Sequence, residues 1–328
     1  MLFGTSTKWG CSRAGPACHT GFEASSRLVI RDSFPSRIVC LTEETTETLY
    51  LLGEGDRVVG ISGYTVRPPE ARSKPKVSAF INARFDKIEA LKPDLILAFS
   101  DLQADIAAEL IRRGYPVVTF NQRSIDEILR MIRIVGALVG RQAAAEALSD
   151  NLERGLDTMR ERGARLPRRP RVFFEEWDDP LISGICWVDE LVEIAGGQPI
   201  FPHLRSASLA KDRIVQPDEV RAADPEVIVA SWCGKAMKKR TIVERPGWNT
   251  TSAVKNDHVY EIKSTYILQP GPASLTEGVA RLHDCIARAA GHEQETGGRR
   301  QDTGHRVSRR QKTGHSDSCL FRQVHPAS

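Results

Sequence analysis

Short apolar runs alternate along the chain with stretches whose apolar residues recur at helical spacing. Strands are predicted at seven of these runs: Arg37–Thr42, Val58–Ser62, Leu95–Phe99, Val117–Asn121, Arg171–Glu176, Val227–Ser231 and Val259–Ser264. Helices are predicted from Thr42 to near Gly53 and over Leu102–Arg113, Val188–Ala195 and Pro272–Ala290. Such alternation of strands and helices is typical of α/β proteins with parallel sheets.

The stretch from Ser124 to about Arg165 has no proline, and its apolar residues keep helical spacing until Pro167. The pattern predicts one long helix over residues 124–166, possible breaks being Gly136 and Gly140. At 1.5 Å per residue such a helix would run on the order of 60 Å. This length suits a rod between two lobes better than a helix that covers a sheet.

An internal repeat supports two lobes. Asp86–Ala98 matches Asp218–Ala230 without a gap: each begins with Asp, has Pro seven positions later and continues into an apolar strand. We therefore expect two Rossmann-like α/β lobes joined by a long backbone helix. The expected parts are a disordered leader (1–35), an N-terminal lobe (36–123), the linking helix (124–166), a C-terminal lobe (167–291) and a disordered basic tail (292–328).

The formal net charge of +4 belongs to the two ends of the chain. Residues 292–328 contain seven Lys/Arg and four Asp/Glu, and residues 1–35 contain four Lys/Arg and two Asp/Glu. Residues 36–291 therefore carry 35 basic and 36 acidic side chains. Because residues 36–291 have no excess positive charge, nucleic-acid binding by this part of the chain is not expected. Binding of nucleic acid by the basic tails is kept as an alternative.

The seven cysteines are scattered, without a CxxC pair or a His/Cys pair at zinc-finger spacing. We expect free thiols, no metal site and no resident cofactor. No apolar run of 7–15 residues follows Lys8 and Arg13, so the leader shows no recognisable export signal. No stretch approaches the ~18–20 apolar residues of a spanning helix.

Several segments together resemble the cobalamin and iron-chelate substrate-binding proteins of ABC importers, and the cobalamin-binding branch most of all. They are Arg37–Thr42 with the Thr/Glu helix that follows, Val59–Tyr64 leading to Pro68 and Pro69, Lys76–Phe80, Ile88–Ala98 and Glu193–Gly197. The resemblance implies a non-catalytic, monomeric protein that captures a corrinoid or another metal chelate and delivers it to a membrane permease. It also implies a periplasmic location. The missing export signal conflicts with that location. Either the start of the sequence is mis-assigned, or the protein is a cytosolic relative that binds another small ligand.

In that branch aromatic faces hold the ligand between the lobes, and the matching positions are Tyr64, Phe80 and Phe99. Phe80 and Phe99 could instead be core residues beside strand ends. In the second lobe four aromatic residues follow predicted strands, where loops of an open α/β sheet line a crevice. These are Trp177, Trp187, Trp232 and Tyr266.

An acidic cluster of Glu175, Glu176, Asp178 and Asp179 follows the first strand of the second lobe. The cluster could bind a ligand with cationic groups or a metal, or it could be a solvated loop. An acid/base enzyme that uses residues 175–179, with His203 or His258, is the alternative function.

The first residues of the repeat suggest docking sites. In the family each lobe presents an acidic residue to arginines of the permease, and Asp86 and Asp218 occupy the matching positions. The alternative is a carboxylate that only stabilises a helix N-terminus, worth roughly 0.3–1 kcal/mol.

Overall fold

The computed structural model describes residues 34–291. The predictions for the leader, up to residue 33, and for the basic tail from residue 292 lie outside the described residues.

The strands of the first half form one sheet, in the order β4-β3-β2-β1-β5-β6. They are β1 (Ile38–Cys40), β2 (Val58–Ser62), β3 (Lys76–Ala79), β4 (Asn82–Ala83), β5 (Leu95–Phe99) and β6 (Val117–Phe120). All pairings are parallel except that of β3 with β4. β1 and β5 are buried along their whole length, which explains why their sequences are unbroken apolar runs. The helices of this half are α1 (Glu43–Leu51), α2 (Phe85–Ala90) and α3 (Ala104–Arg112).

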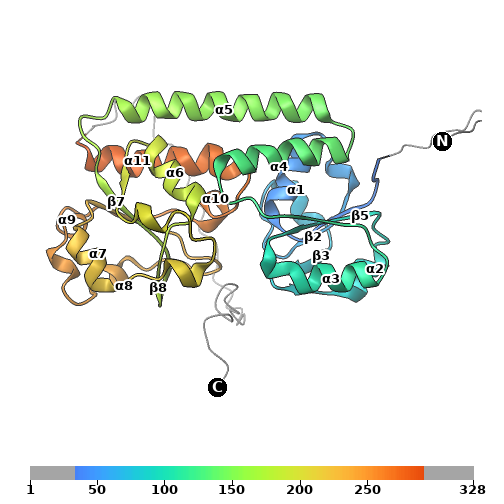
Figure 1. Ribbon diagram of the computed structural model, residues 1–328, viewed down its shortest axis with the longest axis horizontal. Coiled ribbons are helices and arrows are strands. Elements are labelled where there is room, and N and C mark those ends of the chain that lie inside the picture. Colours follow the sequence, from blue (N-terminus) through green and yellow to red (C-terminus); the bar gives the residue numbers. More distant parts are fainter. Residues whose placement is uncertain (1–33, 292–328) are drawn as a thin grey trace, which may run out of the picture. The chain divides into compact units, whose positions relative to one another are not determined.

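A second sheet has β7 at its centre, with the order β11-β10-β7-β8 and with β9 also paired to β7. The strands are β7 (Arg171–Asp178), β8 (Leu181–Ser183), β9 (Gln198–Pro199), β10 (Val227–Ala230) and β11 (Val259–Glu261). The helices are α6 (Cys186–Ile194), α7 (Pro217–Ala223), α8 (Lys239–Val243), α9 (Ser252–Lys255), α10 (Ser264–Ile267) and α11 (Val279–Ala289), the last preceded by a π-helical turn, Ser274–Gly278. The two-lobed α/β fold expected from the sequence is confirmed (Figure 1).

The helix predicted over 124–166 is broken at Gly140, one of its two possible breaks, and the chain turns back there. α4 (Ile125–Leu138) and α5 (Gln142–Ala164) are separate helices that pack against each other (Figure 1). Gly140 takes a φ of +72°, a conformation that ends the first helix. α5 packs against α4 at one end and against α6 and α11 of the second lobe, so its 23 residues alone form the backbone helix.

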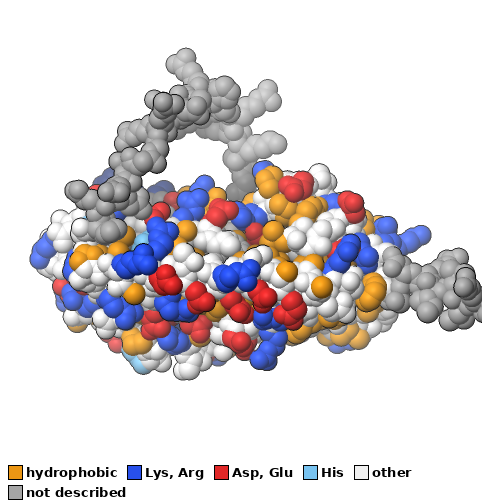
Figure 2. Space-filling view, turned by 90° about the horizontal axis from the view of Figure 1, so that it is seen from above, with side chains coloured by type: hydrophobic (Ala, Val, Ile, Leu, Met, Phe, Trp, Pro, Cys, Tyr) orange, Lys and Arg blue, Asp and Glu red, His pale blue; other side chains and the backbone are white. Residues whose placement is uncertain are grey.

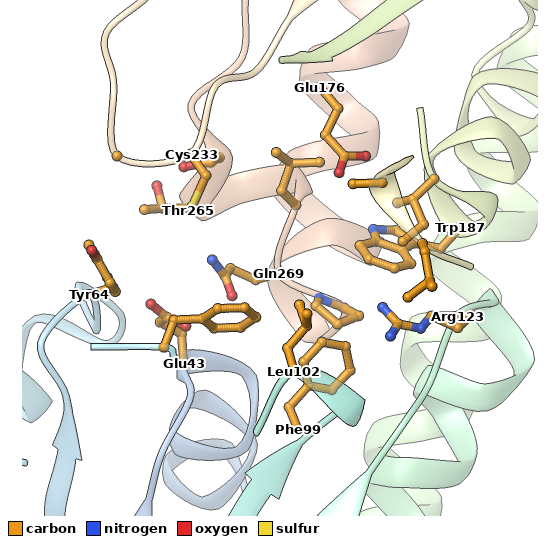
Figure 3. Close-up of a pocket in the computed structure, with 18 of the residues that line it drawn as sticks. Glu43, Tyr64, Phe99, Leu102, Arg123, Glu176, Trp187, Cys233, Thr265 and Gln269 are labelled. Carbon is orange, nitrogen blue, oxygen red and sulfur yellow. The ribbon is translucent and has the colours of Figure 1, made fainter. Parts of the chain in front are cut away.

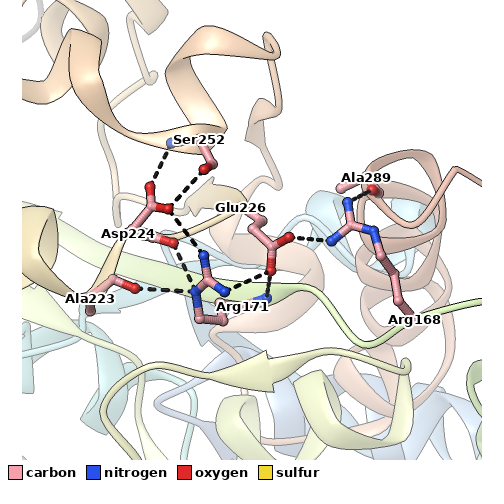
Figure 4. A network of polar contacts seen from close by, with 7 residues as sticks. All are labelled: Arg168, Arg171, Ala223, Asp224, Glu226, Ser252 and Ala289. Carbon is pink, nitrogen blue, oxygen red and sulfur yellow. Dashed lines mark hydrogen bonds and ion pairs between the residues drawn. The ribbon is translucent and has the colours of Figure 1, made fainter.

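The internal repeat corresponds to two equivalent structural units. α2 leads into β5 and α7 leads into β10, through Lys92 and Asp224, which both have positive φ, +47° and +43°. In the second lobe the Arg171 side chain donates to the carbonyls of Ala223 and Asp224 (Figure 4).

The same bonds recur in the first lobe, where Arg37 donates to the carbonyls of Leu91 and Lys92. The carboxylates two residues after each positive-φ residue, Asp94 and Glu226, accept from the backbone N–H of Arg37 and Arg171. Each lobe therefore uses an arginine and a carboxylate to join the end of a helix to the start of a central strand.

Acidic and basic side chains are interspersed over the face that carries α5 (Figure 2). Arg133 of α4, for example, pairs with Glu146 and Glu153 of α5. This mixed surface agrees with the near-neutral charge of residues 36–291. Among the described residues, no helix is both long enough and apolar enough to span a membrane.

The close approach of α4 and α5 predicts the effect of two glycine substitutions. A Cβ at Gly136 would lie 2.3 Å from the Ala145 Cβ, whereas a Cβ at Gly155, on the exposed side of α5, would meet nothing within 4 Å. Gly136→Ala should lower the free energy of unfolding by about 1–3 kcal/mol. Gly155→Ala should raise it by about 0.5–1 kcal/mol, because alanine favours the helix.

Urea unfolding of both variants beside the wild type measures these changes. Equal stabilisation by the two substitutions would show that α4 and α5 do not pack closely at Gly136.

Candidate functional site

A cavity of about 320 Å³ lies between the two lobes (Figure 3). Apolar side chains from both lobes make up much of its wall: Tyr64, Val66, Phe80, Phe99, Leu102, Ile185, Trp187, Leu209 and Leu268. Polar side chains complete it, among them Glu43, Arg123, Glu176, Lys211, Arg213, Cys233, Thr265 and Gln269. An apolar cavity with a few polar groups is the usual form of a small-molecule site. Five of the nine predicted ligand-binding residues line it: Tyr64, Phe80, Phe99, Glu176 and Trp187.

A buried glutamine holds the backbone of two aromatic wall residues. The Gln103 side-chain amide donates to the Phe80 carbonyl at 2.6 Å, and its oxygen accepts from the Phe99 N–H at 3.0 Å. Phe80 has a φ of +50°, a conformation that costs a bulky residue of order 1–3 kcal/mol and that is found most often at functional sites. The two rings lie 6.5 Å apart. Gln103 thus positions both rings at the cavity wall.

Trp187 brings the second lobe to the cavity. Its indole Nε1 donates to the Ile267 carbonyl at 2.9 Å, and its backbone N–H donates to the Arg123 carbonyl at 3.1 Å. The tryptophan is only 3% exposed, and its hydrogen bonds to Ile267 and Arg123 hold the ring in place at the cavity wall.

Strand alternation divides the acidic cluster. Side chains of β7 point to opposite faces in turn. Phe173 and Trp177 pack into one apolar core and Phe174 into another. Glu175 lies on the same face of β7 as Trp177 and is fully buried, whereas Glu176 lies on the opposite face and lines the cavity. The interpretation of Glu175 and Glu176 as part of a solvated loop is wrong, because both belong to a buried strand.

Each of these glutamates pairs with its own arginine. Glu175 accepts from Arg245 at 2.5 and 2.8 Å and from the Trp232 indole at 3.1 Å. Glu176 accepts from both Nη atoms of Arg213, at 2.6 and 3.0 Å. Two-pronged pairing of this kind neutralises a buried carboxylate without water.

Four predicted ligand-binding residues do not line the cavity. Glu175, Trp177 and Trp232 are buried in the second lobe. Tyr266 is half-buried, with the guanidinium groups of Arg67 and Arg281 within 5.5 and 4.2 Å of its ring. A ligand role for these four stays a prediction that their placement does not support.

The other two residues of the acidic cluster, Asp178 and Asp179, lie outside the cavity wall, as do His203 and His258 of the alternative function. Asp178 pairs with Lys235 at 2.6 Å, and Asp179 is exposed. His203 is exposed, and His258 stacks on Tyr260. Across residues 34–291 no three His, Cys, Asp or Glu side chains are grouped as metal ligands. The geometry therefore does not assemble the acid/base site of the alternative function.

Four charged residues of the cavity were not predicted as ligand-binding residues, namely Glu43, Arg123, Lys211 and Arg213, and two of them come shortly after strand ends. Arg123 lies three residues after the end of β6, and its guanidinium lies 5.1 Å from the Phe99 ring. Glu43 begins α1, three residues after the end of β1, and is buried at the wall. The rule that cleft residues follow strand ends could have found both. Burial lowers the pKa of Arg123, and the charge of Arg213 acts in the same direction.

The buried acids of α1 predict how stability depends on pH. Burial, with the neighbouring Glu44, raises the pKa of Glu43 to about 8, and burial raises that of Glu44 to about 7. Because the unfolded chain releases these protons at lower pH, the folded state binds more protons and loses stability as pH rises from about 4.5 to about 8. Glu43 alone can contribute up to about 1.4 kcal/mol per pH unit.

Thermal unfolding of Glu43→Gln at pH 5, 6, 7 and 8 measures this contribution. The stability of the variant relative to the wild type should rise with pH, whereas Glu161→Gln, on the exposed side of α5, should show no such trend. A constant difference between Glu43→Gln and wild type would contradict the raised pKa.

Comparisons with known proteins show which proteins this chain is similar to. An uncharacterized ABC transporter substrate-binding lipoprotein of Bacillus subtilis is 28% identical over 275 residues, covering 80% of this chain and 84% of that protein. A cobalamin-binding protein of Halobacterium salinarum is 26% identical over 274 residues, covering 79% and 72%. The solved periplasmic heme-binding protein of Roseiflexus sp. RS-1, in its apo form, has a TM-score of 0.68 at 23% identity, covering 78% of this chain and 99% of that chain. The model of the family described as "Periplasmic binding protein" matches residues 38–266, and the chain therefore belongs to the periplasmic binding protein family.

Proposed function

We propose that this protein captures a corrinoid or a related flat metal chelate in the cavity between its lobes, for uptake by an ABC importer. The observation that carries the proposal is the aromatic wall. Phe80 lines the cavity from the first lobe. Tyr64 and Phe99 line it from the same lobe, and Trp187 lines it from the second (Figure 3). Such rings bury a large flat ligand without many directed bonds.

The comparisons support both the class of ligand and the role in transport. Proteins described as binding cobalamin and heme are similar to the chain over more than three quarters of its length. Among its relatives is an ABC transporter substrate-binding lipoprotein. In that role the protein would work outside the cytoplasmic membrane and bind its solute without transforming it.

The paired glutamates weaken the alternative of a cationic solute. Glu176 reaches the cavity, but Arg213 already engages both of its oxygens. Glu175 is fully buried on the other face of β7. Neither carboxylate remains to attract a basic ligand.

The docking role of Asp86 and Asp218 is part of the proposal. Both are exposed residues in the first turn of the equivalent helices α2 and α7. These helices belong to different lobes and lie away from α5 (Figure 1). Carboxylates so placed could orient the protein on a permease through complementary charge.

Ligand titration of a cavity variant tests the proposed function. Tyr64→Ala should weaken the binding of dicyanocobalamin or hemin by about 1–2 kcal/mol, roughly five- to thirtyfold, because an aromatic contact is lost. Tyr115→Ala is the matched control, since Tyr115 is also half-buried in the first lobe but does not line the cavity. Equal effects of the two substitutions, or no binding of either chelate to the wild type, would contradict the proposal.

A charge-reversal pair tests docking separately. Asp86→Arg with Asp218→Arg should abolish permease-dependent uptake in proteoliposomes while ligand affinity stays within twofold. The control is Asp126→Arg with Asp150→Arg, which reverses two exposed charges on α4 and α5. Undiminished uptake by the first pair would refute the docking role, and a loss of ligand affinity would assign Asp86 and Asp218 another one.

A further inference from the structure

A network of polar contacts joins the two lobes beside the cavity. Glu47 of α1 accepts from the Arg67 guanidinium at 3.0 Å, and its other oxygen accepts from the backbone N–H of Ala273 at 3.1 Å. Arg67 also donates to Glu277 at 2.8 Å. Glu47 and Arg67 belong to the first lobe, whereas Ala273 and Glu277 belong to the segment that leads into α11 of the second. The four residues therefore form a closed network across the boundary between the lobes.

Burial of Glu47 fixes the position of Arg67. The Glu47 side chain is 10% exposed and that of Arg67 is 27% exposed. Burial raises the pKa of Glu47, and Arg67 counteracts this shift by bonding the ionised carboxylate. An unpaired buried carboxylate would be costly, so Arg67 is held against the first lobe. Its Nη2 then reaches Glu277 in the second lobe.

The lobes also approach each other closely around this network. A Cβ at Gly271 of the second lobe would lie only 2.5 Å from the Cβ of Glu44 in α1. The Tyr266 ring of the second lobe has the Arg67 guanidinium 5.5 Å from its centre. The ion pair of Arg67 with Glu277 is therefore the charged part of a wider junction between the lobes.

The junction is continuous in sequence with both walls of the cavity. In the first lobe Tyr64 and Val66 line the cavity, and Arg67 is the next residue. In the second lobe Thr265 lines it, and Tyr266 is the next residue. Figure 3 shows Tyr64 and Thr265 on the same side of the cavity. Loss of the contact between Arg67 and the second lobe would therefore let these two walls move apart.

We propose that Glu47, Arg67, Ala273 and Glu277 form an electrostatic latch that holds the two lobes together in the ligand-free protein. The side chains of Arg67 and Glu277 are 27% and 45% exposed. An ion pair of this kind is weak and is screened by salt, so the latch can open and close readily. Its opening separates the cavity walls and lets a ligand enter or leave. The latch goes beyond the proposed function, because it acts whether or not a chelate is bound.

Alkylation of Cys233 measures the opening in the ligand-free, full-length protein. Cys233 lines the cavity from the second lobe, so it should react faster with iodoacetamide, a neutral reagent, when the lobes separate. Mass spectrometry of the peptide that contains Cys233 follows the rate. Glu277→Gln should raise this rate by about threefold, within the range expected for a partly exposed ion pair. Arg67→Gln should raise it at least as much, and the double variant should not exceed Arg67→Gln, because both substitutions break the same pair.

Two controls separate opening from loss of structure. Arg133→Gln breaks ion pairs between α4 and α5 whose partners are similarly exposed, and it should leave the Cys233 rate unchanged. Cys40 is fully buried in β1, so its alkylation in the same sample stays slow while the protein is folded. Salt at about 0.5 M should raise the Cys233 rate of the wild type by screening the latch, whereas Glu277→Gln should not respond.

The outcomes decide the proposal without any ligand. Equal Cys233 rates in the wild type and Glu277→Gln would overturn the latch, as would an increase that Arg133→Gln shares. If faster alkylation of Cys40 shows that Arg67→Gln unfolds, Glu277→Gln and the salt response of the wild type carry the test. Failure of the latch leaves the proposed function standing, and a protein that binds no chelate can still show the latch.

Discussion

A carboxylate buried in an apolar wall needs a cation, and the cavity of this protein depends on how that requirement is met. Two adjacent glutamates of β7 point to opposite faces, and each pairs with an arginine distant in sequence. Removing one partner of such a pair typically costs about 3–5 kcal/mol, because the other charge stays buried. The pairing of Glu176 with Arg213 turns what would be an acidic wall into a neutral one. Apolar side chains, four of them aromatic, then make up much of the remaining wall.

Much of the fold could be predicted because its signals are local in sequence. The apolar runs gave the central strands, and the repeat of Asp86–Ala98 at Asp218–Ala230 gave two equivalent units, down to a positive-φ residue at the same place in each. Whether the long helix breaks at Gly136 or Gly140 could not be predicted, because helical periodicity continues through the turn at Gly140. The close contact of Gly136 with Ala145, which folds α5 back on α4, is tertiary and leaves no periodic signal.

Part of the candidate site could also be predicted from the sequence. The family resemblance located Tyr64, Phe80 and Phe99, and the rule that cleft residues follow strand ends located Trp187. Applied further, the rule could have located Arg123 and Glu43. The rule does not say which face of a strand a side chain occupies, so Trp177 was expected in the cleft but lies in the core. Arg213 comes from a short 3₁₀ turn, Ala210–Arg213, and meets Glu176 only in the folded lobe, so no local pattern could reveal the pair.

The central claim is that the cavity between the lobes holds a coloured metal chelate. Native mass spectrometry of the protein, incubated with a mixture of corrinoids and ferric porphyrins and freed of excess ligand, tests it most directly when an absorbance spectrum is taken on the same sample. The account predicts one added mass per chain, equal to that of a chelate in the mixture, together with its visible absorption bands. A folded protein that retains no added mass, or that shows no visible absorption, would contradict it.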